Sequence, residues 1–111
     1  MNNIQLKNKK LKVEILNPGT EYTRSRFDWT GIVKQVTLGK TTFLGTESNN
    51  KDYTGTQGIG LSTEFGISTP VGYKNTLPGS KFMKIGVGAL KRKSIFPYSF
   101  FKDYSVTIFR T

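Results

Sequence analysis

Residues 32–45 read IVKQVTLGKTTFLG, and this stretch decides the expected fold. A run rich in β-branched residues (32–38) is followed by Gly39-Lys40, a two-residue connection that suits a β-hairpin turn, and the chain returns from Thr41. Upstream, LKVEIL (11–16) alternates apolar and charged residues and ends at an Asn-Pro-Gly turn. These patterns predict half-buried antiparallel strands.

The stretch SRFDWTG (25–31) alternates in the same way, so it predicts another strand and its turn. In such a strand Phe27 lies on one face while Arg26 and Asp28 lie on the other. Thr30-Gly31 then reverses the chain. The polar face of this strand is a candidate edge of a binding site.

Further along, residues 45–60 are polar and rich in glycine, which predicts a long exposed loop. Glycine and proline interruptions leave only short strands in residues 61–73. MKIGVGALKRK (83–93) predicts one strand in which the glycines mark a bulge or a close backbone approach. YSVTIF (104–109) predicts the last strand.

The chain has 111 residues, which fits a single domain, 1–111. None of its windows repeats apolar residues at the spacing of a helix. With 35% hydrophobic and 13% aromatic residues, the chain can bury a core. We therefore expect an all-β fold, and an antiparallel β-sandwich in preference to a barrel.

Positive charge dominates the composition, since the chain has 17 lysines and arginines but only 7 acidic residues, which gives a net charge of +10. Such a charge favours polyanions before any specific site exists. The lysines cluster at residues 7–12 and 91–93, where the pattern also fits solvated strand ends or turns. Aromatic residues follow the second cluster: Phe96, Tyr98, Phe100 and Phe101. These residues either fill the core or form a basic β module that binds single-stranded nucleic acid.

Cysteine and histidine are both absent. This excludes disulfides, thiolate chemistry and a Ser/His/Asp triad. The acids show no EF-hand-like spacing, so we expect neither a metal site nor a cofactor. No segment has the apolar length of a membrane span, and the N-terminus lacks the apolar region of a signal peptide, which favours a cytoplasmic protein that does not bind membranes.

Several stretches form an ordered set: SRFDWTGIVKQVTL (25–38), a later TF (42–43), GIGLSTEFGISTPVGY (58–73), FMKIGVGALKR (82–92) and PYSFFKDYSV (97–106). This set resembles the N-terminal part of galactose-mutarotase-like proteins, particularly the aldose 1-epimerase-like group, over about residues 11–106. The resemblance implies part of a β-supersandwich that binds a hexose or hexose phosphate. The family reaction interconverts sugar anomers.

The same resemblance implies that this chain lacks the family's catalytic pair. In that family a carboxylate takes the proton of the anomeric hydroxyl while a histidine donates one to the ring oxygen. This chain has no histidine, and the family's general base lies in a later part of its longer proteins. We therefore assign no catalytic residue, and an enzyme acting alone is the least favoured of the functions considered.

Four residues are candidates for sugar contacts. Arg26 has paired donors for hydroxyls or a phosphate, and Asp28 shares its face. Trp29 has a ring that can stack on a pyranose, and Glu64 can accept from hydroxyls. In the packing alternative Arg26 pairs with a carboxylate, Trp29 fills the core and Glu64 is a solvated loop acid.

A partial sandwich exposes unpaired strand edges and half a core. We therefore expect a homo-oligomer, or a partner chain that supplies the missing strands. Three functions remain open: a mutarotase-like domain that binds sugar weakly or not at all, a subunit completed by a partner, and a basic module that binds nucleic acid.

Overall fold

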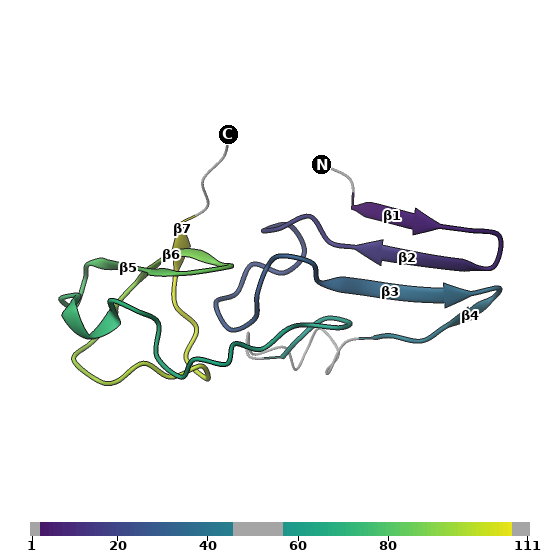
Figure 1. The fold of residues 1–111 in the computed structure, drawn as a ribbon. Helices are drawn as coiled ribbons and strands as arrows, with labels where there is room; N and C mark the ends of the chain where they lie inside the picture. Colours follow the sequence, from purple (N-terminus) through teal and green to yellow (C-terminus); the bar gives the residue numbers. More distant parts are fainter. Residues whose placement is uncertain (1–2, 46–56, 108–111) are drawn as a thin grey trace.

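The computed structural model describes residues 3–45 and 57–107, and within them the fold is all-β, with two antiparallel sheets (Figure 1). The first sheet has the order β1-β2-β3-β4 and consists of β1 (Ile4–Lys7), β2 (Leu11–Ile15), β3 (Val33–Leu38) and β4 (Thr41–Thr42). The second has the order β5-β6-β7 and consists of β5 (Lys81–Lys84), β6 (Gly88–Lys91) and β7 (Val106–Thr107). A 3₁₀ helix, η1 (Tyr73–Asn75), is the one helical element of the described residues.

The hairpin predicted around Gly39-Lys40 is confirmed. β2 and β3 coincide with the two predicted runs and pair with each other. Leu38 pairs with Thr41 across the Gly39-Lys40 turn, although the return strand ends at Thr42. The lysines of residues 7–12 lie on strand ends and in the β1–β2 turn, where they are largely exposed.

Other predicted strands are wrong. Residues 25–31 form bends and turns, although burial alternates from Ser25 to Trp29 as the pattern requires. Residues 83–93 are not one strand, because the chain reverses at residues 85–87 and divides the run into β5 and β6. Residues 61–73 contain no strand and contribute only an isolated bridge to Val33.

Two further differences concern the chain ends and the long loop. The sequence pattern missed β1, a short strand whose residues are all exposed. The last strand is found as β7, and residues 108–109 of its predicted range lie outside the described residues. Residues 46–56 of the predicted loop also lie outside them.

The first sheet separates apolar from polar side chains. Ile4 pairs with Ile15, and Val13 is flanked by Leu6 and Val36, so all five residues share one side. We call this side the aliphatic face, which consists of Ile4, Leu6, Leu11, Val13, Ile15, Val33, Val36 and Leu38. The opposite side carries Gln5, Lys7, Lys12, Glu14, Gln35 and Thr37.

A bulge preserves this separation at the end of β3. Glu14 pairs with Gln35, but the register then shifts and Ile15 pairs with Val33. A regular ladder would place Lys34 opposite Ile15 and so put a charge on the aliphatic face. The bulge instead lets the Lys34 ammonium donate to the Glu21 carboxylate at 2.9 Å.

The first core lies in the connection between β2 and β3. It is formed by Leu16, Tyr22, Phe27, Trp29 and Ile32. The second core is aromatic and is formed by Tyr73, Phe82, Leu90 and Tyr104. Val87 and Val106 pack against both cores, so the second sheet and the 16–32 connection are held together.

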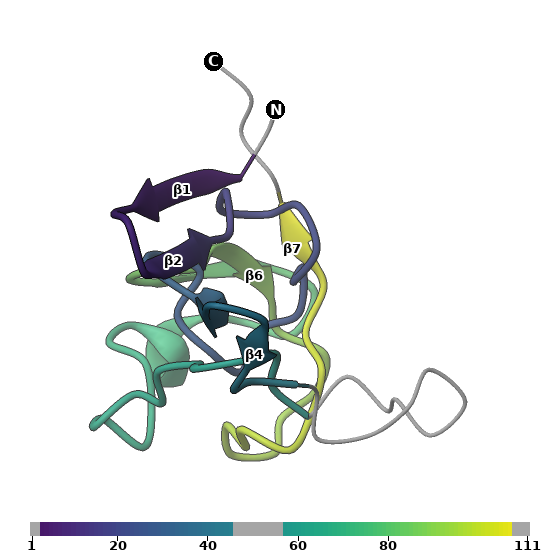
Figure 2. The same ribbon diagram turned by 90° about the vertical axis from the view of Figure 1, so that its right-hand side faces the viewer.

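The two sheets lie towards opposite ends of the long axis of the molecule, with the 16–32 connection between them (Figure 1). Figure 2 looks along this axis and shows β6 behind β2. The molecule measures 52 × 32 × 24 Å. Within residues 3–45 and 57–107, no helix is long and apolar enough to cross a membrane.

Candidate functional site

A cleft with charged, aromatic and hydroxyl groups lies beside β5. Its volume is about 290 Å³, and we call it the polar cleft. It is lined by Glu64, Phe65, Gly66, Ile67, Ser68, Lys84, Tyr98 and Phe100. This volume is at the small end of ligand pockets, which begin at about 300 Å³.

Arg26 and Glu64 meet at the edge of the polar cleft. The Arg26 guanidinium donates from Nη2 to Oε2 of Glu64 at 2.9 Å and from Nε to both carboxylate oxygens at 3.2 and 3.3 Å. The guanidinium also lies 4.9 Å from the ring centre of Phe100. Because the Glu64 side chain is 46% exposed, the pair adds little stability, but it fixes the direction of both groups.

Lys84 is the buried cation of the cleft. The alternation of β5 turns Phe82 and Lys84 inward, and Lys84 is only 5% exposed. Its ammonium donates to the carbonyls of Ser25 and Arg26 at 2.6 and 3.0 Å and to the Tyr98 hydroxyl at 2.7 Å. These acceptors match the three donors of an ammonium, so Lys84 holds the 25–26 backbone and Tyr98 in place.

The Tyr98 hydroxyl is oriented by this contact. Since its oxygen accepts from Lys84, its own proton must point elsewhere. Burial raises the pKa of Tyr98 well above its ordinary value, so the hydroxyl stays protonated at neutral pH. Tyr98 lines the cleft, and its hydroxyl proton is not used in the contact with Lys84.

Asp28 lies near this group but is engaged in a local turn. Its Oδ1 accepts from the Thr30 amide at 2.8 Å and from the Thr30 hydroxyl at 2.6 Å. The carboxylate sits against Gly86, where a Cβ would come within 2.6 Å of Oδ1. Gly86 also has a φ of +89°, so the glycine meets both demands of the β5–β6 turn. The sequence predicted a bulge or a close backbone approach in a strand, whereas the structure has a side chain against a glycine in a turn.

Trp29 points the other way and belongs to the first core. It is 5% exposed, its ring contacts Gly19, and its indole N–H donates to the Arg24 carbonyl at 2.7 Å. The structure therefore brings Arg26 and Glu64 together and keeps Asp28 close by. It places Trp29 in the core, pairs Arg26 with a carboxylate and leaves Glu64 exposed in a loop, as the packing alternative had all three.

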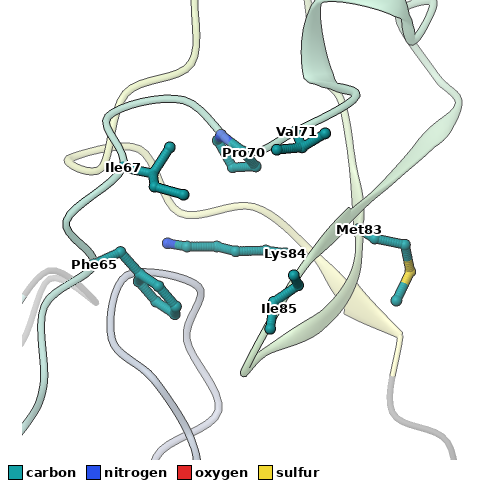
Figure 3. Close-up of a pocket in the computed structure, with 7 residues that line it drawn as sticks. All are labelled: Phe65, Ile67, Pro70, Val71, Met83, Lys84 and Ile85. Atoms are coloured by element: carbon teal, nitrogen blue, oxygen red, sulfur yellow. The ribbon is translucent and has the colours of Figure 1, made fainter.

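An apolar pocket of about 280 Å³ adjoins the polar cleft. It is lined by Phe65, Ile67, Pro70, Val71, Met83, Lys84 and Ile85, and it shares Phe65, Ile67 and Lys84 with the cleft. Figure 3 shows the Lys84 side chain extending from β5 towards Phe65 and Ile67. The Lys84 ammonium lies 4.3 Å from the ring centre of Phe65, which adds a cation–π contact.

Burial of Lys84 makes stability depend on pH. Burial is the main cause that lowers its pKa from 10.5 to about 8, nearby Arg26 lowers it further, and Glu64 and Asp28 partly offset the shift. Between these two pKa values the unfolded chain binds more protons than the folded protein, so stability rises with pH. The gain is at most about 1.4 kcal/mol per pH unit.

Denaturant unfolding between pH 8 and 9, where tyrosines with an ordinary pKa near 10 are still mostly protonated, measures this rise. We expect Lys84→Met to lose the rise, while Lys81→Met, at an exposed position of the same strand, keeps it. Equal pH slopes in the wild type and Lys84→Met would contradict the assignment.

Sequence reasoning missed Lys84, Phe65 and the role of Tyr98. A signal for Lys84 was present, because KFMK places a lysine on the same side of a strand as Phe82. The reading of residues 83–93 as one strand hid it, since that reading starts after Phe82. Phe65 lies outside strands and carries no pattern that marks it, and Tyr98 was named only as one of the aromatic residues after the second basic cluster.

Among the described residues, no cluster of three or more acidic side chains could hold a metal ion. Comparisons of the chain with protein-family models, curated proteins and solved structures find no match.

Proposed function

We propose that the polar cleft binds a hexose or a hexose phosphate, as a mutarotase-like carbohydrate-binding domain would. The observation that carries the proposal is the Arg26–Glu64 pair fixed at the mouth of a small cleft with aromatic walls. Sugars present hydroxyls around a ring with apolar C–H faces, so a site for them needs fixed donors and acceptors beside aromatic rings.

Each wall of the cleft has a role in this proposal. Glu64 accepts from sugar hydroxyls with the lone pairs that Arg26 leaves unused, and Tyr98 donates. Phe65 and Phe100 lie against the C–H face of the ring. Arg26 attracts the phosphate of a hexose phosphate, for which a guanidinium is a good partner.

Anomer interconversion needs an acid and a base on opposite sides of the sugar. Lys84 does not fill either role, because its ammonium is held by two carbonyls and Tyr98. We therefore propose that this chain binds sugar without catalysing the family reaction by itself. The β-sandwich of the family is part of the same proposal, and it rests on the resemblance and on the two antiparallel sheets.

Replacing Glu64 by glutamine is expected to weaken hexose binding by about tenfold or more, because charged hydrogen bonds to the sugar are lost. Titration calorimetry with galactose, glucose and their phosphates measures the effect. Glu21→Gln is the matched control, since Glu21 forms a similar exposed pair with Lys34 on the first sheet. Equal binding by both variants, or no binding by the wild type, would contradict the proposal.

Exposed phenylalanines favour a second candidate function, binding of single-stranded nucleic acid. Phe96, Phe100 and Phe101 are 62, 40 and 64% exposed, and the Lys102 ammonium lies 5.3 Å from the Phe96 ring centre. Bases stack on such rings, and binding to nucleic acid weakens steeply with salt. Binding of a neutral hexose is insensitive to salt, so a salt series separates the two functions.

A further inference from the structure

The aliphatic face of the first sheet is not covered by the rest of the described chain. Ile4, Leu6 and Leu38 are 50, 57 and 48% exposed, and Leu11 is 37% exposed. None of the residues of this face belongs to either core or packs against one. An extended, wholly aliphatic sheet face of this kind marks an interaction surface.

The remaining residues of this chain are poorly suited to cover it. Residues 1–2 read MN, residues 46–56 read TESNNKDYTGT, which is almost entirely polar, and residues 108–111 read IFRT. These stretches have too few apolar side chains to pair with the residues on three neighbouring strands. The cover therefore comes from another molecule or from additional chain.

The distribution of charge indicates which kind of molecule packs on the aliphatic face. The protein carries a net charge of +10, yet the aliphatic face has no charged residue, and Lys7 and Lys12 lie on the opposite side of the sheet. An acidic partner would be attracted to the lysine side and not to this one. A surface without charge fits another surface without charge, and the same face of a second copy meets that requirement.

We propose that the aliphatic face packs against the same face of a second copy, so that two first sheets form a two-layered sandwich. A symmetric dimer of this kind has an isologous interface, in which each patch meets itself. Sheets packed in this way lie about 10 Å apart with interdigitating side chains. The lysine sides then lie on the two outer surfaces of the dimer.

The area that two copies would bury against each other sets the expected affinity of the dimer. Strands about 4.8 Å apart with a rise of about 3.4 Å per residue give a face on the order of 350 Å² in projection. Protruding side chains make the accessible area larger than this projected area. Two copies therefore bury an area near the lower limit of specific interfaces, about 1,000 Å². We therefore expect dissociation in the micromolar range, and tighter association in salt because screening reduces repulsion between the positive copies.

Sedimentation velocity over a concentration series tests the proposal with matched pairs of variants. Leu6→Lys and Leu38→Lys each place a charge on the aliphatic face at positions already exposed in one copy. Gln5→Lys and Thr37→Lys add the same charge to the adjacent residue, on the opposite side of the sheet. Circular dichroism and the fluorescence of the buried Trp29 check that each variant folds.

The proposal predicts a dimer whose dissociation constant rises at least about 30-fold in Leu6→Lys and Leu38→Lys and little in the two controls. A wild type that remains monomeric, or one that forms open-ended polymers, would overturn it. Equal weakening by variants on both sides of the sheet would also overturn it and would point to pairing through the β1 edge.

Discussion

Replacing Arg92 by methionine is expected to lower the free energy of unfolding by about 3–5 kcal/mol. The Arg92 side chain is 9% exposed, and its guanidinium lies 4.2 Å from the ring centre of Tyr73. It donates to the carbonyls of Tyr73, Thr76, Ser94 and Ile95 at 2.7 to 3.0 Å. Methionine fills similar space but removes the guanidinium donors from these carbonyls, although the Tyr73 carbonyl keeps its bond from the Thr76 amide at 3.1 Å.

Lys91→Met is the control for this substitution, because Lys91 is exposed at the end of β6. Its effect is expected to stay within about 0.5 kcal/mol. Denaturant unfolding measures both variants. If the two variants had equal stability, the carbonyl cluster around Arg92 would not hold η1 and residues 94–96 together as we describe.

Replacing Gly60 by alanine is the second large effect, an expected loss of about 3 kcal/mol. Gly60 has a φ of +56°, and a Cβ there would lie 2.1 Å from the Val33 carbonyl oxygen and 2.8 Å from that of Lys34. To avoid this clash, residues 60–61 must move away from β3. This movement breaks the Leu61–Val33 hydrogen bonds of 2.9 and 3.3 Å.

The same substitution should also weaken sugar binding, because Glu64 lies shortly after Gly60 in the displaced segment. Gly66→Ala is the control for stability, since a Cβ at Gly66 meets no atom within 4 Å. Unfolding curves and calorimetric titration with a hexose give the two readouts. A Gly60→Ala protein as stable as Gly66→Ala would show that residues 57–64 do not pack on β3.

Sequence patterns predicted those parts of the fold that depend on neighbouring residues alone. The β2 and β3 runs and the Gly39-Lys40 turn are of this kind. Residues 25–29 show the limit of such patterns: burial alternates, but the segment bonds to isolated groups such as the Thr63 and Gly86 carbonyls and forms no ladder. Alternation predicts which side chains are buried and does not by itself predict a strand.

The glycines of residues 83–93 are compatible with three structures that the sequence could not separate. A glycine in a strand marks a bulge, a close approach or a turn. The choice here depends on the Asp28 carboxylate, which packs on Gly86 from far away in the sequence. The packing alternative predicted a carboxylate partner for Arg26, but the sequence could not identify Glu64 as that partner, because the two residues lie 38 positions apart.

The number of basic residues in the sequence does not show how many of them are exposed. Residues 91–93 read as a basic cluster, but the Arg92 guanidinium is buried among carbonyls and Lys93 donates to the Asp103 carbonyl. Within the described residues, less of this cluster is therefore available to nucleic acid than the sequence implied. The exposed phenylalanines at residues 96–101 remain the main support for that function.

The central claim is that the polar cleft binds a hexose. Its most direct test is to titrate the ¹⁵N-labelled protein with galactose, glucose and their phosphates and to follow the backbone amides by NMR. We predict saturable shifts at residues 64–68, 84 and 98–100, and their loss in Glu64→Gln but not in Glu21→Gln. No shifts with any sugar, or equal shifts in the wild type and Glu64→Gln, would contradict the claim.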